Sequence, residues 1–257
     1  MQLLLAYRNN LFSSVLQPSM TRLRALKSLA AATLVASLAL TGAASAKVTE
    51  IGALADGELG SCPEAGATPV PVPADQVCQA LTKLTGYQAK VGPDRSLYQA
   101  PADGRIVAWT ISLGKPGPKQ AEYFKARYGA VSQAAVVVLS PGKKLARTAV
   151  AKAPLQRLEP FFGLSVQFPL DRSLPIKKGQ YIGLSVPSWA PALQLGLGND
   201  SSWRASRAKR LCGDSTITST QTALLGNRSA SEFGCLYKTT RLTYSATFIP
   251  TPVKAAT

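Results

Sequence analysis

The amino-acid sequence of 257 residues predicts an all-β protein, a single antiparallel β-sandwich of jelly-roll-like form with one short helix and two disulfides. Two observations predict this class. Several segments alternate apolar and polar residues with a period of two, which is the pattern of a strand with one buried face. Gly and Pro residues stand between these segments, where a chain of short strands needs turns. A chain of this length can form one undivided sandwich.

The alternation places the individual strands. The segment 105–113 is expected to bury Val107, Trp109, Ile111 and Leu113, with Trp109 packing in the core. Three further segments alternate in the same way, and their expected inward residues are Leu164, Val166, Phe168 and Leu170, then Ile182, Leu184 and Val186, and finally Leu242, Tyr244, Ala246 and Phe248. The last segment is expected to point Arg241, Thr243, Ser245 and Thr247 outward.

A continuous apolar run from Ala134 to Leu139 differs from these segments, because it has no polar face. This run predicts a strand that is buried on both sides.

One helix is expected, from Pro118 to about Tyr128. Proline is favoured in the first turn of a helix, where its missing N–H has no partner to lose. Ala121, Phe124 and Tyr128 then fall on one face and predict the side that packs against the sandwich.

The beginning of the chain has the three parts of an export signal. A basic stretch from Met20 to Lys27 precedes an apolar segment that ends at Leu40, and small residues follow at 44–46. The apolar segment is too short to span a membrane. We therefore predict that residues 1–46 are upstream residues and a signal peptide, with the true start at Met20 and cleavage after Ala46.

The mature chain predicted in this way is residues 47–257, one secreted β-sandwich domain without a transmembrane span. Its loose, proline-bearing parts are expected at 68–74 and in a C-terminal tail at 250–257.

All four cysteines follow Ala46, and an even number of cysteines in an exported chain predicts two disulfides. Four cysteines allow three pairings. We favour Cys62 with Cys78 and Cys212 with Cys235, because cysteines close in sequence pair at low loop-closure cost. No two cysteines have the C-x-x-C spacing of structural zinc sites.

The chain has no histidine, so it has no Ser-His-Asp or Cys-His constellation and lacks the commonest transition-metal ligand. Hydrolysis by paired carboxylates needs only Asp or Glu. Glu122 and Glu159 are among the few acids that could take that role, although ordinary surface acids are the simpler interpretation. We predict no enzymatic activity, no metal and no cofactor.

The charge balance indicates the kind of partner. The formal net charge of +16 falls by four, to +12, when Arg8, Arg22, Arg24 and Lys27 leave with the export segment. Such a basic exported protein suits anionic surroundings, whereas specific nucleic-acid binding is not expected.

Two tryptophans and a basic cluster are the candidate ligand-binding residues. Trp189 and Trp203 are expected in loops, where an indole could stack on a sugar ring. The alternative role for both rings is to cap the edge of the core. The densest basic patch follows Trp203 directly and consists of Arg204, Arg207, Lys209 and Arg210. A solvated charged loop is the alternative for this patch.

One stretch supports a resemblance. The residues from Leu170 to Leu184 include a Gly turn that feeds a core strand, and Thr85 to Ala89 and Asp103 to Trp109 continue the pattern. In these segments the chain resembles secreted jelly-roll-like β-sandwich proteins of unknown function from high-GC Gram-positive bacteria. The resemblance implies a fold and a compartment, and it carries over no site residue.

The predicted function is a noncatalytic extracellular binding or surface-interaction domain, directed at anionic cell-wall or glycan material. Cell-wall association and oligomerisation both fit this location. Two alternatives stay open, a structural β-sandwich that self-assembles through its faces or edges, and a carboxylate-based glycan hydrolase.

Overall fold

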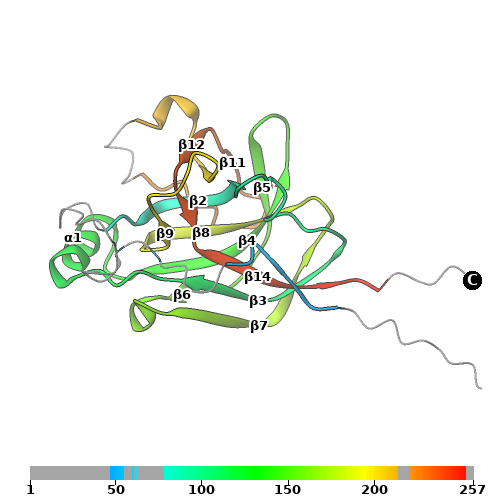
Figure 1. Cartoon of the computed structure of the whole chain (residues 1–257), viewed down its shortest axis with the longest axis horizontal. Helices are drawn as coiled ribbons and strands as arrows, with labels where there is room; N and C mark the ends of the chain where they lie inside the picture. Colours follow the sequence, from blue (N-terminus) through cyan, green and yellow to red (C-terminus); the bar gives the residue numbers. More distant parts are fainter. Residues whose placement is uncertain (1–46, 55–59, 61, 63–77, 214–219, 253–257) are drawn as a thin grey trace, which may run out of the picture. The chain divides into compact units, whose positions relative to one another are not determined.

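A computed structural model of the chain describes residues 47–54, 60, 62, 78–213 and 220–252 (Figure 1). These residues belong to one compact unit. The predicted export segment, the loose segment 68–74 and the end of the C-terminal tail, 253–257, lie outside the described residues. The described strands are β1 (Thr49–Ile51), β2 (Leu81–Lys90), β3 (Gly104–Ser112), β4 (Gln133–Pro141), β5 (Ala146–Lys152), β6 (Gln156–Arg157), β7 (Ser165–Ile176), β8 (Tyr181–Ala190), β9 (Leu193–Gln194), β10 (Ser202–Ala205), β11 (Ala230–Glu232), β12 (Cys235–Lys238), β13 (Arg241–Leu242) and β14 (Tyr244–Pro250). The helices are α1 (Pro118–Tyr128) and two short 3₁₀ turns, η1 (Glu159–Phe161) and η2 (Lys209–Leu211).

The described strands form antiparallel sheets, so the predicted all-β class is confirmed. The smaller of the two main sheets has the order β1-β14-β3-β7. The larger sheet has the order β11-β5-β4-β8-β2-β10-β12, with β6 paired to β4. A third, two-stranded sheet joins β13 and β9. The main core draws side chains from both large sheets, which makes the arrangement sandwich-like. The jelly-roll topology stays a prediction.

Strand β4 confirms the expectation drawn from its continuous apolar run. Val136 and Val138 pack in the core between the sheets. Val137 and Leu139 point to the opposite face, where a second apolar cluster covers them. That cluster also contains Tyr87, Ala149, Leu224 and Phe233. Both faces of β4 contact apolar side chains, which explains why residues 134–139 include no polar residue.

The residues that the alternation directs inward in β8 and β14, and Leu242 of β13, are all buried as predicted. In β7 the pattern holds less well: Phe168 is buried, but Leu164 lies just before the strand and is 57% exposed. The expectation for Leu164 is therefore wrong. Leu164 precedes Ser165, the first residue of β7 that pairs with β3, so no strand pairing directs its side chain inward.

Strand β3 departs from strict alternation at one residue. Trp109 and Ile111 are fully buried as expected, but Ile106 is buried in place of Val107. Val107 has no partner in the register of β3 with β14 or with β7, since both ladders pass from Ile106 to Ala108. An extra residue of this kind is a β-bulge, which reverses the alternation on one side of it. The expectation for Val107 is corrected accordingly.

Three residues of the last strands that were expected to point outward, Arg241, Thr243 and Ser245, are buried, so that expectation is wrong. Arg241 Nη2 donates a hydrogen bond to the Ala53 carbonyl at 2.7 Å. Ser245 Oγ donates to the Glu50 carboxylate at 2.6 Å. Strand β1 pairs with β14, so the segment at residues 49–53 covers polar groups that the alternation directed outward.

Helix α1 has the predicted bounds and packs on β8 through its apolar face. Phe124 and Tyr128 are buried, and the Phe124 ring lies 5.1 Å from the Trp189 ring, measured between centroids. Gly129 ends the helix with a φ of 126°, and its N–H donates to the Lys125 carbonyl. Glycine adopts this backbone conformation without a steric penalty.

Both disulfides have the predicted pairing. Cys62 bonds to Cys78, and Cys212 bonds to Cys235. The second bond ties the end of the η2 turn to the start of β12. Near neighbours in sequence thus pair with each other, as the loop-closure argument expects.

Two tyrosines join the two main sheets through the core. Tyr244 of β14 is fully buried, and its hydroxyl donates to the Ile182 carbonyl of β8 at 2.9 Å. The Tyr98 hydroxyl donates to the Tyr244 carbonyl at 3.1 Å, and the two rings lie 5.1 Å apart. These contacts place a polar bridge inside an otherwise apolar core.

Replacing Tyr244 by Phe removes the bond to Ile182 and keeps the ring. We expect the free energy of unfolding to fall by about 1–2 kcal/mol, because a buried carbonyl loses its donor. Urea denaturation measures the change. Tyr123→Phe on the exposed side of α1 is the control and should change stability by less than about 0.5 kcal/mol. Equal effects of the two variants would contradict a special role for the bridge.

Tyr244 also predicts how stability depends on alkaline pH. Burial raises the pKa of Tyr244 well above its ordinary value, so the folded state favours the neutral phenol. The resulting stability is fully present below about pH 10, the ordinary tyrosine pKa, and is lost as the pH rises above it. Thermal melts between pH 8 and 11 should therefore show a steeper loss for the unmodified protein than for Tyr244→Phe. An equal loss of stability with pH in the two proteins would contradict this prediction.

Candidate functional site

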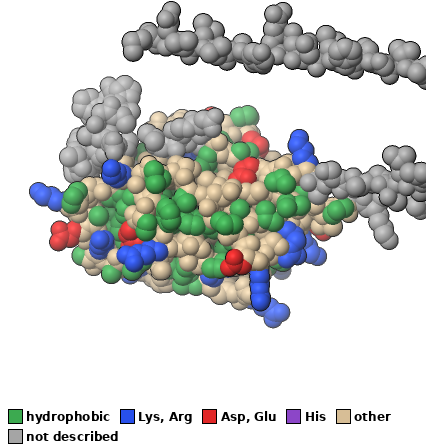
Figure 2. Space-filling view, turned by 90° about the horizontal axis from the view of Figure 1, so that it is seen from below, with side chains coloured by type: hydrophobic (Ala, Val, Ile, Leu, Met, Phe, Trp, Pro, Cys, Tyr) green, Lys and Arg blue, Asp and Glu red, His purple; other side chains and the backbone are tan. Residues whose placement is uncertain are grey.

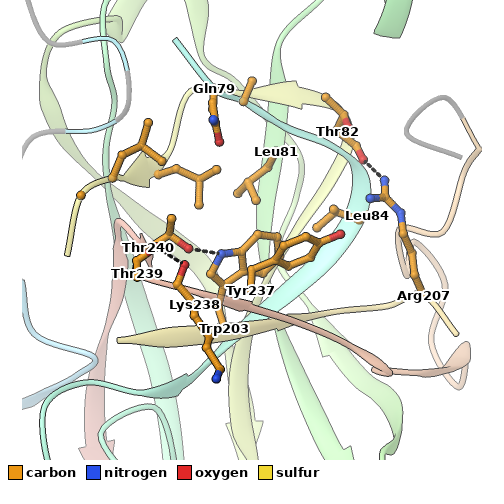
Figure 3. A pocket seen from close by; sticks show the side chains of 14 residues that line it. Gln79, Leu81, Thr82, Leu84, Trp203, Arg207, Tyr237, Lys238, Thr239 and Thr240 are labelled. Carbon is orange, nitrogen blue, oxygen red and sulfur yellow. Dashed lines mark hydrogen bonds between the residues drawn. The ribbon is translucent and has the colours of Figure 1, made fainter. Parts of the chain in front are cut away.

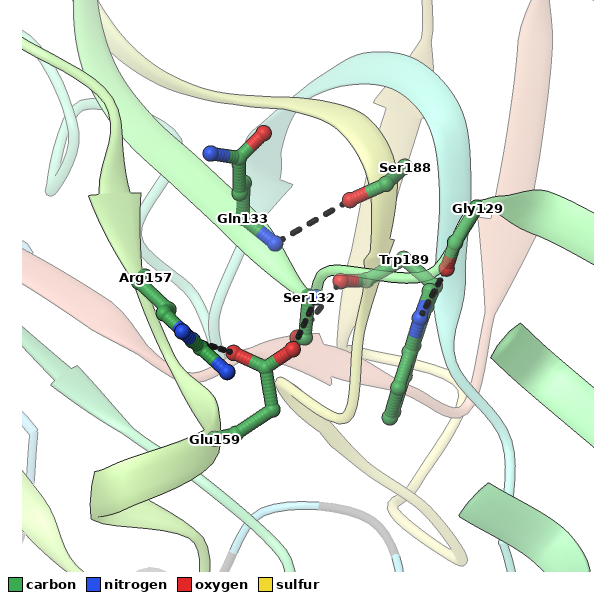
Figure 4. Close-up of polar contacts among 7 residues, drawn as sticks. All are labelled: Gly129, Ser132, Gln133, Arg157, Glu159, Ser188 and Trp189. Atoms are coloured by element: carbon green, nitrogen blue, oxygen red, sulfur yellow. Dashed lines mark hydrogen bonds and ion pairs between the residues drawn. The ribbon is translucent and has the colours of Figure 1, made fainter. Parts of the chain in front are cut away.

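Trp189, expected in a loop, lies in β8 and is fully buried, so its predicted placement is wrong. Its ring packs between Phe124 and Phe162, and its indole N–H donates to the Gly129 carbonyl at 3.0 Å (Figure 4). The neighbouring Pro187 suggested a loop, but the β2–β8 register shifts beside it, and a proline is tolerated where the ladder is interrupted. The buried ring offers no face for stacking on a sugar.

Trp203, the second tryptophan, lies in β10 rather than in a loop. Its ring stacks on Tyr237 of β12 with centroids 4.5 Å apart and an interplanar angle of 24°. The indole N–H donates to the Thr240 hydroxyl at 2.8 Å. The expected loop placement is again wrong. Trp203 does, however, line a cleft, as described below.

The basic cluster that follows Trp203 divides into two pairs. Arg204 donates to the Phe233 carbonyl at 3.2 Å, and Arg207, only 5% exposed, donates to the Thr82 carbonyl at 2.9 Å. Lys209 and Arg210 are exposed on η2, beside the second disulfide. The four cations therefore do not form one exposed surface. Their role in ligand binding stays a prediction.

Glu159, a candidate catalytic carboxylate, is held by two structural contacts (Figure 4). The Ser132 amide donates to one carboxylate oxygen at 2.7 Å, and Arg157 Nε donates to the other at 3.2 Å. The Ser132 hydroxyl in turn donates to the Trp189 carbonyl at 2.8 Å. Glu159 thus fixes the chain that enters β4. Glu122 is exposed on α1.

A cleft of about 550 Å³ lies between the first residues of β2 and the small β9–β13 sheet (Figure 3). The stacked pair Trp203 and Tyr237 lines it, and Arg207 lies at its edge. The remaining lining residues are Gln79, Ala80, Leu81, Thr82, Leu84, Leu193, Leu195, Gly196, Lys238, Thr239 and Thr240. No pattern in the sequence indicates this cleft, because its walls come from segments far apart along the chain.

Three turns bring exposed cations to one end of the larger sheet. Leu139 pairs with Tyr181, so the turn after β4 and the turn before β8 lie at the same end of the larger sheet. The β2–β3 connection joins them through a bridge between Gln99 and Tyr181. We name this region the cationic end; its exposed cations are Arg95, Lys143, Lys144, Lys177 and Lys178. The Lys-Lys pairs are visible in the sequence, but their proximity depends on the β4–β8 pairing.

Two carboxylates near these turns, Asp94 and Asp103, accept hydrogen bonds from turn groups, and a third, that of Asp200, lies beside Gly92 of the β2–β3 connection. Asp94 accepts from the Ser96 amide at 2.6 Å and from the Ser96 hydroxyl at 2.8 Å. These bonds hold the pKa of Asp94 below its ordinary value. Asp103 accepts from the Lys178 amide at 2.8 Å. Across the described ranges the structure shows one ion pair, between Arg157 and Glu159. The lysine ammonium groups at the cationic end therefore face solvent.

One face of the molecule shows how charge is distributed over the surface (Figure 2). Lys and Arg side chains gather at both ends of the view, and apolar side chains lie across its middle. Cations are thus not spread evenly over this face.

No protein-family model, curated protein or solved structure matches this chain. What the geometry itself defines is an all-β, disulfide-bonded sandwich with a cleft beside Trp203 and a cationic end. Over the part of the chain that the structure describes, no helix has the length and apolar character needed to cross a membrane.

The contacts of Glu159 predict the effect of its substitution. Glu159→Gln removes the charge that strengthens both contacts, so we expect a loss of about 1 kcal/mol in the free energy of unfolding. Chemical denaturation measures it. Glu122→Gln is the matched control and should leave stability unchanged, since Glu122 is exposed. A neutral effect of Glu159→Gln would show that the carboxylate does not stabilise the entry to β4.

Proposed function

We propose that this protein is a noncatalytic binding protein that works outside the cell and adheres to anionic polymers of the cell wall or to acidic glycans. The observation that carries the proposal is the cationic end. Five exposed cations come from three turns, while Asp94 and Asp103 are bonded to turn groups. Clustered charge of one sign attracts a polyanion and raises its rate of association.

The chemistry of the cationic end favours a polymer over a small ligand. Four of its five cations are lysines, which are strongly hydrated point charges on flexible stems. Such groups suit many weak contacts along a repeating anion better than one fixed geometry. Binding of this kind is expected to weaken with salt, because exposed charges are screened over about 10 Å at 0.1 M ionic strength.

An extracellular location is supported by two features. The two disulfides are typical of proteins in an oxidising environment. The residues before Lys47 have the three parts of an export signal.

The two alternative functions have less support. Edge-to-edge assembly is disfavoured at β7, a long edge strand of the smaller sheet, because Pro169 and Pro175 interrupt its hydrogen-bonding pattern. The other edge, β1, is only three residues long. A carboxylate-based hydrolase has little support from Glu159, whose two oxygens both accept structural hydrogen bonds.

Binding to dextran sulfate, with neutral dextran as the comparison polymer, tests the proposal. We expect the unmodified protein to bind dextran sulfate at low salt and to be released at high salt. The variant Lys143→Gln, Lys144→Gln, Lys177→Gln, Lys178→Gln should bind about 30-fold more weakly, since each exposed cation contributes about 0.5 kcal/mol. Isothermal titration calorimetry at two salt concentrations measures both effects.

A second quadruple variant provides the matched control. Lys115→Gln, Lys119→Gln, Lys125→Gln, Arg127→Gln removes the same charge from exposed positions outside the cationic end. We expect it to lose far less affinity. Equal losses in the two variants would mean that only net charge matters, and salt-independent binding or equal binding to neutral dextran would contradict the proposal outright.

A further inference from the structure

The cleft beside Trp203 is a second candidate site, separate from the cationic end. Its Leu81 pairs with Ala190, at the end of β8 opposite to Tyr181. Leu81, Leu84, Leu193 and Leu195 supply aliphatic side chains, and the Trp203–Tyr237 pair supplies an aromatic surface (Figure 3). A volume of about 550 Å³ and a mainly apolar lining are typical of sites for small organic molecules.

The polar groups of the cleft have one sign of charge. Lys238 and Arg207 line it, and among the described lining residues there is no Asp or Glu. Figure 3 shows the guanidinium of Arg207 at the side of the cleft, next to Thr82. Because a buried cation is costly unless its donors are satisfied, the state of this guanidinium indicates what the cleft can accept.

Arg207 is only partly satisfied by the protein. One terminal nitrogen, Nη2, donates to the Thr82 carbonyl at 2.9 Å. Its Nε is buried, and no group in the described segments accepts a hydrogen bond from it. The side chain is 5% exposed, so bulk water does not replace the missing partner. Among the described residues this guanidinium has no counter-ion, so an anion in the cleft would neutralise its charge.

We propose that the cleft binds a small apolar monocarboxylic acid. Its hydrocarbon part lies against the four leucines and the Trp203–Tyr237 pair, and its carboxylate lies beside the two cations of the cleft, Arg207 and Lys238. The two cations, with no carboxylate among the lining residues that the structure describes, disfavour a cationic ligand. A neutral apolar molecule of the same length would contact the same walls and leave the charge of Arg207 without a counter-ion.

Octanoate and 1-octanol, which share a chain length and differ in charge, test the proposal on the folded protein at pH 7. Titration is followed by tryptophan fluorescence and calorimetry. We expect octanoate to bind at least tenfold more tightly than 1-octanol. In Arg207→Gln the affinity for octanoate should fall at least tenfold and that for 1-octanol should stay the same. Lys209→Gln, an exposed cation outside the cleft, is the matched control and should change neither.

A filling variant keeps the test independent of Arg207, whose bond to Thr82 contributes to folding. Leu195→Trp places a larger side chain in the cleft and should abolish binding of both probes, with a thermal melt showing that the protein stays folded. Absence of octanoate binding by the unmodified protein would overturn the proposal. So would octanoate binding that survives both Arg207→Gln and Leu195→Trp. None of these results depends on dextran sulfate binding, so the two proposals can fail separately.

Discussion

The polar bridge through the core is the contact on which the arrangement of the two sheets depends. Tyr244 of β14 reaches the backbone of β8, and Tyr98 reaches the backbone of β14. Apolar packing alone brings the sheets together without fixing how one lies over the other. Directional bonds between fully buried groups add that constraint, since any shift would leave a carbonyl without a donor. The positions of the turns at the ends of the strands therefore depend on this alignment.

A shortage of acids shapes the electrostatics of the whole protein. The chain has 29 basic residues and 13 acids, so buried cations must find other partners. Arg147 lies over the rings of Tyr87 and Tyr181, 5.3 and 5.2 Å from their centroids, and donates to the Ala146 carbonyl. Arg207 donates to a carbonyl as well. Backbone oxygens and aromatic faces thus stabilise the buried guanidinium groups, and exposed lysines at the turns are left to meet anions from outside.

Local patterns predicted the elements well, and pairing between distant strands explains where they failed. The helix from Pro118, the doubly buried run of β4 and both disulfides follow from residues close in sequence. The bulge at Val107 does not, because it appears only in the register with β14 and β7. The prediction that Trp189 lies in a loop failed for a related reason, because Pro187 marks an interruption in the pairing of β2 with β8 rather than a loop. Of the candidate site residues, the sequence could not tell buried Arg207 from exposed Lys209.

By itself, the sequence determined the class of the fold, the doubly buried strand and the excess of positive charge, and it favoured the cysteine pairing that the structure has. Each of these depends on composition or on the spacing of near neighbours. Only the tertiary structure decided which cations face solvent and where a cleft opens. The β4–β8 pairing joins the lysine turns, and the meeting of β2, β9, β10, β12 and β13 encloses the leucines with Trp203 and Arg207. Such neighbours are set by the packing of the sheets, which no local pattern encodes.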